Sequence, residues 1–378
     1  MSDAAFLTLQ VVSVALATAA GAGVLAAWAR RAHGLGVGAL VLAGVAAAAA
    51  TAVLCAVGHA GPGMSGFGSV RLVFLTGAIS VPLLGAAVLL LHVARRTPAT
   101  RGALLLAATA LCGAPLAAHM TWIEPRRLVV ERCDVPLAAR CSGSTPVRIA
   151  VLADLQCDAI GEHERAAVDA LLAERPDLIL VPGDTFQGYE HQWAAAQEEF
   201  LALMRRLDAP GGVWFVPGDV DARATVEALE TRTAIRVLRN EIAEVRVGDR
   251  VVRIAGSSRW PGRGFLDALE TTPGDDVRIL LTHAPDLALA LRPSSRVDLV
   301  VAGHTHGGQI VLPLFGPPMT LSRVPRAVAA GGLHELDGRR VYVSRGVGME
   351  RKQAPRVRLL CPPEVSILTL RGGAEPGR

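Results

Sequence analysis

Acidic residues and histidines recur at the carboxyl ends of short apolar runs in the second part of the chain. Carboxylate and imidazole groups together suit Mn²⁺, Fe²⁺ or Zn²⁺, and a shared carboxylate can bridge two such ions about 4 Å apart. Ions held in this way activate water for hydrolysis. We therefore predict a metal centre built from residues at successive strand ends. They are Asp154, Asp184, Asp219, His283, His304 and His306.

Glycine comes directly before two of these aspartates, in the Pro-Gly-Asp sequences at 182–184 and 217–219. It lets the backbone turn sharply and present the carboxylate at the edge of a sheet. A single aspartate at a strand end is most often a turn former or a helix cap, and a single loop histidine is most often a surface residue. The recurrence at successive strand ends favours one shared site.

An α/β scaffold is needed to bring these side chains together. From residue 147 onward, short apolar runs alternate with amphipathic segments, which predicts strands at 147–152, 178–181 and 212–216 and helices at 164–174 and 193–207. The Gly-Asp pair at 248–249 favours a hairpin, so we expect a sheet that is partly antiparallel. Further strands are expected at 245–247, 251–255, 277–281, 299–301, 340–344 and 365–370.

The first third of the chain has a different composition. Residues 1–125 hold eight of the 72 charged residues. A helix needs roughly 20 apolar residues to span the hydrocarbon core of a bilayer, and four uncharged stretches reach that length. They predict four transmembrane helices, at about 5–29, 35–57, 72–94 and 102–121.

Arginines between these stretches predict the orientation of the spans. The first and third connections carry two and three arginines, the second carries one, and no arginine precedes the first span. Short arginine-rich loops stay in the cytoplasm, so we expect a multi-pass protein of the cell membrane with its second part outside the cytoplasm. Cys133 and Cys141 could then form a disulfide.

Charge also excludes some functions. The whole net charge of +4 lies in the apolar part, and the rest of the chain is neutral. No basic face for nucleic acid is expected, so the lipid bilayer and a phosphate-containing substrate are the expected partners. The hydrophobic content of 51% excludes a disordered chain.

The order of the motifs resembles that of the calcineurin-like metallophosphoesterase superfamily, and in particular its membrane-linked bacterial branch. The sequence GHTHGGQI at 303–310 is the most specific element, followed by SRGVG at 344–348 and CPPE at 361–364. The resemblance implies an α/β fold, a sandwich of two mixed β-sheets flanked by helices, here preceded by the four transmembrane helices. It also implies hydrolysis of phosphomonoesters, phosphodiesters or pyrophosphates at a dinuclear metal centre.

We expect four segments. Residues 1–125 form the membrane domain, 126–145 a linker, 146–372 the metallophosphoesterase-like domain and 373–378 a tail.

The resemblance also implies roles for the site residues. Asp154 and His306 would hold the first metal ion, Asp184 would bridge both ions, and three residues would hold the second. Those three are Asp219, His283 and His304. We expect Asp184 and Asp221 to take part in catalysis.

Three positions depart from the family pattern. Asp219 stands where the family has an asparagine, and a carboxylate there can still bind the second metal ion. Gln156 stands where the family has a histidine ligand, and an amide oxygen is a weaker ligand, so either two metal ions or only one could bind. Val220 replaces the histidine that contacts the phosphate and protonates the leaving group. Loss of a general acid typically lowers the rate by about 10²–10⁴-fold, unless the leaving group is already acidic.

Three hypotheses follow. The first is a membrane-anchored, metal-dependent phosphoesterase that acts on a phosphate ester or a pyrophosphate, with lipid-linked compounds among the candidates. The alternative is a degenerate phosphoesterase that binds a metal or a phosphate ligand as a sensor or scaffold. A transporter is least favoured, because the apolar stretches lack the charged residues that transport pathways use.

Overall fold

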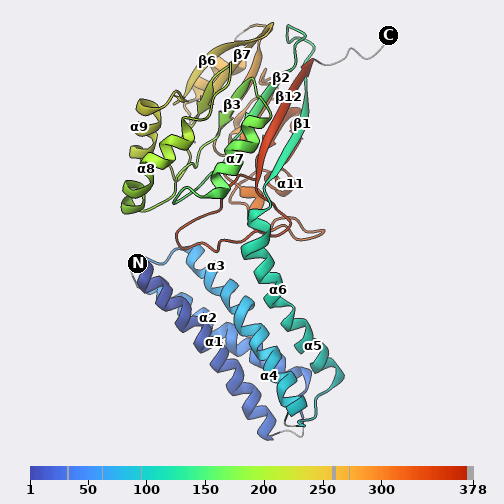
Figure 1. Cartoon of the computed structure of the whole chain (residues 1–378). Helices are drawn as coiled ribbons and strands as arrows, with labels where there is room; N and C mark the ends of the chain where they lie inside the picture. Colours follow the sequence, from blue (N-terminus) through green and yellow to red (C-terminus); the bar gives the residue numbers. More distant parts are fainter. Residues whose placement is uncertain (32–33, 62, 95, 258–260, 272, 373–378) are drawn as a thin grey trace, which may run out of the picture. The chain divides into compact units, whose positions relative to one another are not determined.

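The computed structural model describes residues 1–372 except 32–33, 62, 95, 258–260 and 272. The chain divides into two compact units (Figure 1). The helical unit comprises Met1–Ile123 and Lys352–Arg356, and the sheet unit comprises Glu124–Arg351 and Val357–Arg378. The expected tail at 373–378 lies outside the described residues.

Among the described residues, four continuous helical segments are long and apolar enough to cross a membrane, as the sequence predicts. They are Asp3–Arg31, Val37–Ala60, Gly66–Ala94 and Arg101–Arg126. Two of them contain a π-helical turn, η1 in the third and η2 in the fourth. The component helices are α1 (Asp3–Arg31), α2 (Val37–Ala60), α3 (Gly66–Leu75), η1 (Thr76–Ser80), α4 (Val81–Ala94), α5 (Arg101–Leu111), α6 (Gly113–Ala118), η2 (His119–Ile123) and η3 (Glu124–Arg126).

Hydroxyl pairs connect the helices at the turn η1. Oγ1 of Thr51 lies 2.7 Å from Oγ1 of Thr76, and Oγ1 of Thr18 donates to Oγ of Ser80 over 3.0 Å. Buried alanines of α1, α2 and α5 form part of the apolar core of the same helices. Small side chains and interhelical hydrogen bonds are the usual means of helix association in lipid.

Two six-stranded sheets form the core of the sheet unit. The first sheet has the order β1-β12-β2-β3-β4-β5, and the second has the order β10-β11-β9-β8-β7-β6. The first contains β1 (Val129–Leu137), β2 (Val147–Val151), β3 (Leu178–Val181), β4 (Val213–Phe215), β5 (Arg236–Val237) and β12 (Glu364–Gly372). The second contains β6 (Glu241–Val247), β7 (Arg250–Ser257), β8 (Val277–Thr282), β9 (Leu299–Ala302), β10 (Gly332–Leu336) and β11 (Arg339–Val343).

Both sheets are mixed, which confirms the predicted fold class. In the first sheet, β2 to β5 run parallel and β12 is antiparallel to β2. In the second, β7, β8, β9 and β11 run parallel, while β6 and β10 are antiparallel edge strands.

Strand β1 lies inside the segment 126–145, which the sequence analysis treats as a linker. It pairs in parallel with β12, from Val129 opposite Glu364 to Leu137 opposite Gly372. As an edge strand it is only partly buried and carries several charged residues, so its sequence lacks the continuous apolar run of a central strand.

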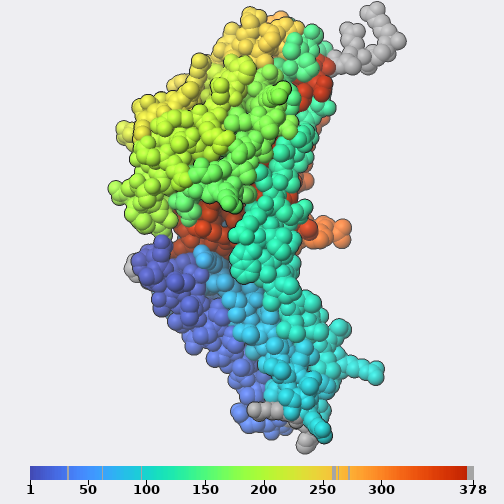
Figure 2. All heavy atoms as spheres, viewed as in Figure 1, coloured from blue at the N-terminus to red at the C-terminus, as the bar shows by residue number. Residues whose placement is uncertain are grey.

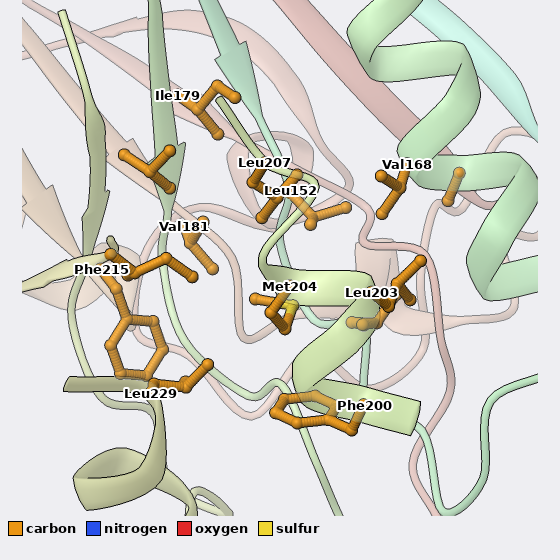
Figure 3. Close-up of a cluster of buried hydrophobic side chains, with 14 of the residues drawn as sticks. Leu152, Val168, Ile179, Val181, Phe200, Leu203, Met204, Leu207, Phe215 and Leu229 are labelled. Atoms are coloured by element: carbon orange, nitrogen blue, oxygen red, sulfur yellow. The ribbon is translucent and has the colours of Figure 1, made fainter. Parts of the chain in front are cut away.

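Helices cover both outer faces of the paired sheets. Helices α7 (Glu162–Ala173), α8 (Glu190–Met204) and α9 (Arg223–Arg232) pack on the first sheet, and their side chains form a continuous green to yellow layer in Figure 2. Phe200 and Met204 of α8 meet Val181 and Phe215 of the sheet in this core (Figure 3). Helices α10 (Arg263–Thr271) and α11 (Arg326–Ala329) and the turn η4 (Pro285–Ala290) lie against the second sheet.

Cys133 and Cys141 do not form the disulfide considered from the sequence, because both are free. Cys141 is buried, with its Sγ 3.5 Å from Oδ1 of Asp298. Burial, with a further contribution from this carboxylate, raises the pKa of the Cys141 thiol to about 11. The thiol is therefore protonated and unreactive at neutral pH.

Candidate metal centre

The predicted site residues follow parallel strands of both sheets. Asp154, Asp184 and Asp219 come after β2, β3 and β4, while His283 and His304 come after β8 and β9. The structure brings these side chains together at the carboxyl ends of the strands. Two clusters of potential metal ligands result: one contains Asp219, His283 and His304, and the other contains Asp154, Asp184 and His283.

Distances within the first of these clusters are short. Nδ1 of His304 lies 3.2 Å from Nε2 of His283 and 3.4 Å from Oδ2 of Asp219. Nε2 of His283 also lies 3.3 Å from Oδ2 of Asp184. Three ligand-type side chains thus converge in this cluster, and His283 connects it to Asp184 of the second cluster, an arrangement that suits divalent cations.

Backbone carbonyls orient both imidazoles. Nδ1 of His283 lies 2.8 Å from the carbonyl oxygen of Pro182, and Nε2 of His304 lies 3.3 Å from that of Leu321. Because a carbonyl only accepts, each of these nitrogens carries a proton and donates. The opposite nitrogen of each ring faces the cluster, as in metal-bound histidines whose second nitrogen donates to a backbone carbonyl.

Asp184 stands between the two clusters. Its Oδ2 faces His283, and its Oδ1 accepts a hydrogen bond from the backbone N–H of Val220 at 3.0 Å. On the other side, the Asp154 carboxylate accepts from the backbone N–H of His304 at 3.0 and 3.1 Å and lies 3.9 Å from Nε2 of His306. Because Asp184 lies between the two clusters, its position is suitable for a ligand that bridges two metal ions. The bridging role of Asp184 stays a prediction.

Two buried polar atoms of predicted ligands of the first metal ion lack a hydrogen-bond partner among the described residues. They are Nδ1 of His306 and Oε1 of Gln156. A buried polar atom without a partner is unfavourable by about 1–3 kcal/mol. An amide oxygen and an unprotonated imidazole nitrogen are both lone-pair donors that a cation could satisfy, so the donor chemistry of these residues fits a first metal ion.

Electrostatics at the site also favour bound cations. Burial raises the pKa of Asp154 to about 8, with a further contribution from the Asp184 carboxylate. Burial alone would lower the pKa of His283, but Asp184 raises it to about 10. At neutral pH without a metal, Asp154 therefore holds a proton and the protonated His283 balances the charge of Asp184, and a cation would displace both protons.

Glycines allow the loops to approach one another closely. A Cβ atom at Gly218 would lie 2.1 Å from Oδ1 of Asp184, and one at Gly303 would lie 2.3 Å from Oδ2 of Asp154. Asp154, Asp184 and His304 themselves have left-handed backbone conformations, with φ of 47°, 53° and 73°. Such strain in residues other than glycine is typical of functional sites.

The carboxylate of Asp221 contacts the backbone near the site, and its expected catalytic role stays a prediction. Its carboxylate accepts hydrogen bonds from the N–H of Asp184 (2.7 Å), the N–H and Oγ1 of Thr185 (2.8 and 2.6 Å) and the N–H of Gly218 (2.8 Å). The side chain is thus directed at the backbone of two loops. These contacts favour a positioning role, because they fix the turn that carries Asp184.

Sequence reasoning missed two residues that support the site. The buried guanidinium of Arg358 donates to the carbonyls of Arg345, Gly346 and Gly348, and the N–H of Gly348 in turn donates to the carbonyl of Asp154. Glu350 accepts from Gln156 at 3.1 Å. The SRGVG sequence pointed to this region, but no signal distinguished these two side chains.

Comparisons with known proteins identify the family. The profile of the calcineurin-like phosphoesterase family matches residues 147–308. An uncharacterized metallophosphoesterase of Aquifex aeolicus is 30% identical over 265 residues, which cover 66% of this chain and 94% of that protein. This chain belongs to the calcineurin-like phosphoesterase family. The family hydrolyses phosphate esters and generally binds two metal ions.

Two further relatives belong to the same family. The uncharacterized metallophosphoesterase YkuE of Bacillus subtilis is 30% identical over 227 residues, which cover 56% of this chain and 73% of YkuE. The phosphodiesterase YaeI of Escherichia coli is 28% identical over 244 residues, which cover 60% of this chain and 83% of YaeI. All three alignments are much shorter than the chain.

Proposed function

We propose that this protein is a membrane-anchored, metal-dependent phosphoesterase. The observation that carries the proposal is the convergence of carboxylates and oriented imidazoles around Asp184. Four apolar helices support membrane anchoring, and the arginine distribution supports a catalytic unit outside the cytoplasm. Accessibility of a tag after Gly372 to protease in intact cells tests this sidedness; a protected tag would reject it.

When bound, the two metal ions would activate water and neutralise negative charge on the phosphate. The chain's own residues hold and orient that centre. His283 and His304 present nitrogens fixed by backbone carbonyls, and Asp184 is held in place by Val220 N–H and by the Asp221 loop.

Val220 restricts the substrate. Its side chain cannot donate a proton, and its backbone N–H is engaged by Asp184. A leaving group must therefore depart as a stable anion without protonation by this residue. Aryl phosphodiesters and pyrophosphates meet that requirement, whereas alkyl phosphates do not.

An exposed apolar loop supports a lipid-linked substrate. The apolar loop comprises residues 312–321. Its exposed side chains include Phe315 and the fully exposed Leu314. Leu321, at the end of the loop, accepts the hydrogen bond from His304 through its carbonyl, so the loop adjoins the candidate metal centre. Contiguous exposed apolar residues typically mark a protein or membrane interaction site.

Hydrolysis by the full-length protein in detergent with Mn²⁺ tests the proposal. We expect cleavage of an aryl phosphodiester and of a lipid pyrophosphate, with a soluble pyrophosphate as the comparison that separates lipid recognition from phosphate recognition. Asp184→Ala and His304→Ala should abolish all three activities, while Glu230→Gln, in an exposed ion pair with Arg239, should not. Unchanged activity in both alanine variants would reject the assigned site.

The replacements at Gln156 and Val220 support a second candidate, a degenerate phosphoesterase that binds a metal or phosphate ligand as a sensor. Under that function, the double variant Gln156→His, Val220→His should gain an activity that the parent lacks. If the wild-type protein is already as active as the double variant, the sensor function is excluded.

A further inference from the structure

The backbone of Gln156 is fixed from two sides. Its N–H donates to the carbonyl of Asp184 at 2.9 Å, and its carbonyl accepts from Nε of Arg351 at 2.5 Å. Gln156 has a left-handed conformation with φ of 38°, two residues after Asp154, and its side chain is fully buried. The amide therefore lies in the same turn as a predicted ligand of the first metal ion.

Glu350 determines which end of the Gln156 amide is hydrogen-bonded and which end is left without a partner. Nε2 of Gln156 donates to Oε2 of Glu350 at 3.1 Å. An ionised carboxylate only accepts hydrogen bonds, so the amide must present its NH₂ group to Glu350. Oε1 is turned away as a consequence, and it is the buried oxygen without a hydrogen-bond partner among the described residues.

Glu350 is itself held by two further glutamines. Its Oε1 accepts from Nε2 of Gln187 at 2.6 Å, and its N–H donates to Oε1 of Gln309 at 2.9 Å. Gln187 is also fixed, because its Oε1 accepts from the N–H of Arg351 at 2.7 Å. The carboxylate thus has a defined position rather than the freedom of a surface glutamate.

We propose that Glu350 is a positioning residue that makes the Gln156 amide an oxygen ligand of the first metal ion. This inference rests on the proposed function. Without Glu350 the amide could also turn its NH₂ group toward the ion, and an NH₂ group has no lone pair available for a cation. Metal-bound histidines are oriented by a carboxylate in the same way, and loss of such partners typically lowers metal affinity by about 10–100-fold.

Titration of Mn²⁺ into the chelator-treated full-length protein tests the inference, with stoichiometry measured by elemental analysis. The wild type should bind two ions per chain. In Glu350→Gln, the new amide can either accept from or donate to Gln156, so the orientation is lost. We expect one ion to bind about 10–100-fold more weakly and the other to bind as in the wild type. Two ions bound as tightly as in the wild type would overturn the inference, and so would the loss of both.

A double-mutant cycle separates positioning from a general effect on folding. Gln156→Ala should weaken the same single ion, and adding Glu350→Gln to it should cause no further loss, because the ligand that Glu350 orients is already absent. Glu230→Gln serves as the control, since it removes an equal charge from an exposed ion pair. A further loss in the double variant would contradict the positioning role.

These results are distinguishable from those that test the proposed function. Two ions in the wild type, one weakened in Glu350→Gln and no hydrolysis of any substrate would reject the phosphoesterase activity and support the role of Glu350. Hydrolysis by the wild type, together with unchanged Mn²⁺ binding in Glu350→Gln, would support the phosphoesterase activity and reject the role of Glu350. Fewer than two ions in the wild type would overturn the inference directly.

Discussion

Nδ1 of His283 lies 2.8 Å from the carbonyl oxygen of Pro182. His283 follows a strand of the second sheet, whereas Pro182 begins the turn of the first sheet that carries Asp184. The same turn therefore supplies a carboxylate to the site and orients the histidine that faces this carboxylate. The relative position of the two sheets is thus part of the geometry of the site.

Replacement of His283 tests this relationship. We expect His283→Ala to lose one metal ion per chain and to lower hydrolysis of an aryl phosphodiester by more than about 100-fold, beyond the range for outer residues of metal sites. His334→Ala is the matched control, because His334 lies on the edge strand β10 and contacts the carbonyl of Gly331. Full metal content in His283→Ala would show that the residue is not a ligand.

Gly218 should not tolerate a side chain. A Cβ at this position would lie 2.1 Å from Oδ1 and 2.5 Å from the backbone nitrogen of Asp184, so the turn would have to move. We expect Gly218→Ala to lower both the unfolding temperature and the metal content. Gly264→Ala should do neither, because nothing lies within 4 Å of its added Cβ and alanine favours the helix. Normal metal content in Gly218→Ala would contradict the close approach.

Asp221→Asn distinguishes positioning from acid catalysis. An asparagine offers one acceptor oxygen where the carboxylate now accepts from four donors, so we expect a destabilisation of about 2–4 kcal/mol and a lower metal affinity. Chemical unfolding and Mn²⁺ titration measure the two effects. Unaltered stability combined with loss of the acidic limb of the pH–rate profile would instead support a role in proton transfer.

The pKa shifts predict how metal binding depends on pH. The pKa of Asp154 is raised to about 8 by burial, and that of His283 is raised to about 10 by Asp184 against the effect of burial. Below pH 8 a cation must displace protons from both groups, and between pH 8 and 10 from His283 alone. Mn²⁺ affinity should therefore rise about 100-fold per pH unit below pH 8 and about tenfold per pH unit between pH 8 and pH 10.

The same shifts predict the stability of the metal-free protein. The folded state holds a proton on Asp154 from about pH 4 to pH 8, where the unfolded state has released it, so raising the pH over this range reduces the free energy of unfolding. Thermal unfolding with a chelator at pH 6.5 and 7.5 measures this loss, because the opposite contribution of the lowered pKa of His306 lies mostly below pH 6.5. Greater stability at pH 7.5 would contradict the raised pKa of Asp154.

The apolar loop should matter only for lipid substrates. We expect Leu314→Asp to reduce hydrolysis of a lipid pyrophosphate in vesicles by at least tenfold, since a charge opposes contact with hydrocarbon. Hydrolysis of the soluble aryl phosphodiester should be unchanged. Ile242→Asp, at a half-exposed position on β6, is the control. Equal effects on both substrates would exclude lipid recognition by this loop.

The positions of the predicted ligands could be anticipated from the sequence because parallel strands bring their carboxyl ends to one edge. Asp154, Asp184 and His283 follow apolar runs that are recognisable in the sequence alone. The direction of a side chain is a different matter. Asp221 lies in the predicted motif, but only the structure shows that its carboxylate faces the backbone N–H groups of Asp184 and Thr185.

Glu350 and strand β1 could not be anticipated for related reasons. Glu350 lies 194 residues after Gln156, in a segment without regular structure, so no spacing connects the two. Strand β1 is an edge strand whose pairing with β12 depends on a partner more than 200 residues away. Contacts of such long sequence separation leave no local pattern in either segment.

The position of β12 also determines when the first sheet can assemble during translation. In the first sheet β12 lies between β1 and β2, and it follows every other strand of the described residues in the sequence. At about 5–20 residues per second, a ribosome makes β12 some 10 to 45 s after β1. Until then β1 has no neighbour in the sheet. Four apolar helices thus leave the ribosome before the hydrolase-type unit can close, and assembly of the first sheet must wait until β12 has been made.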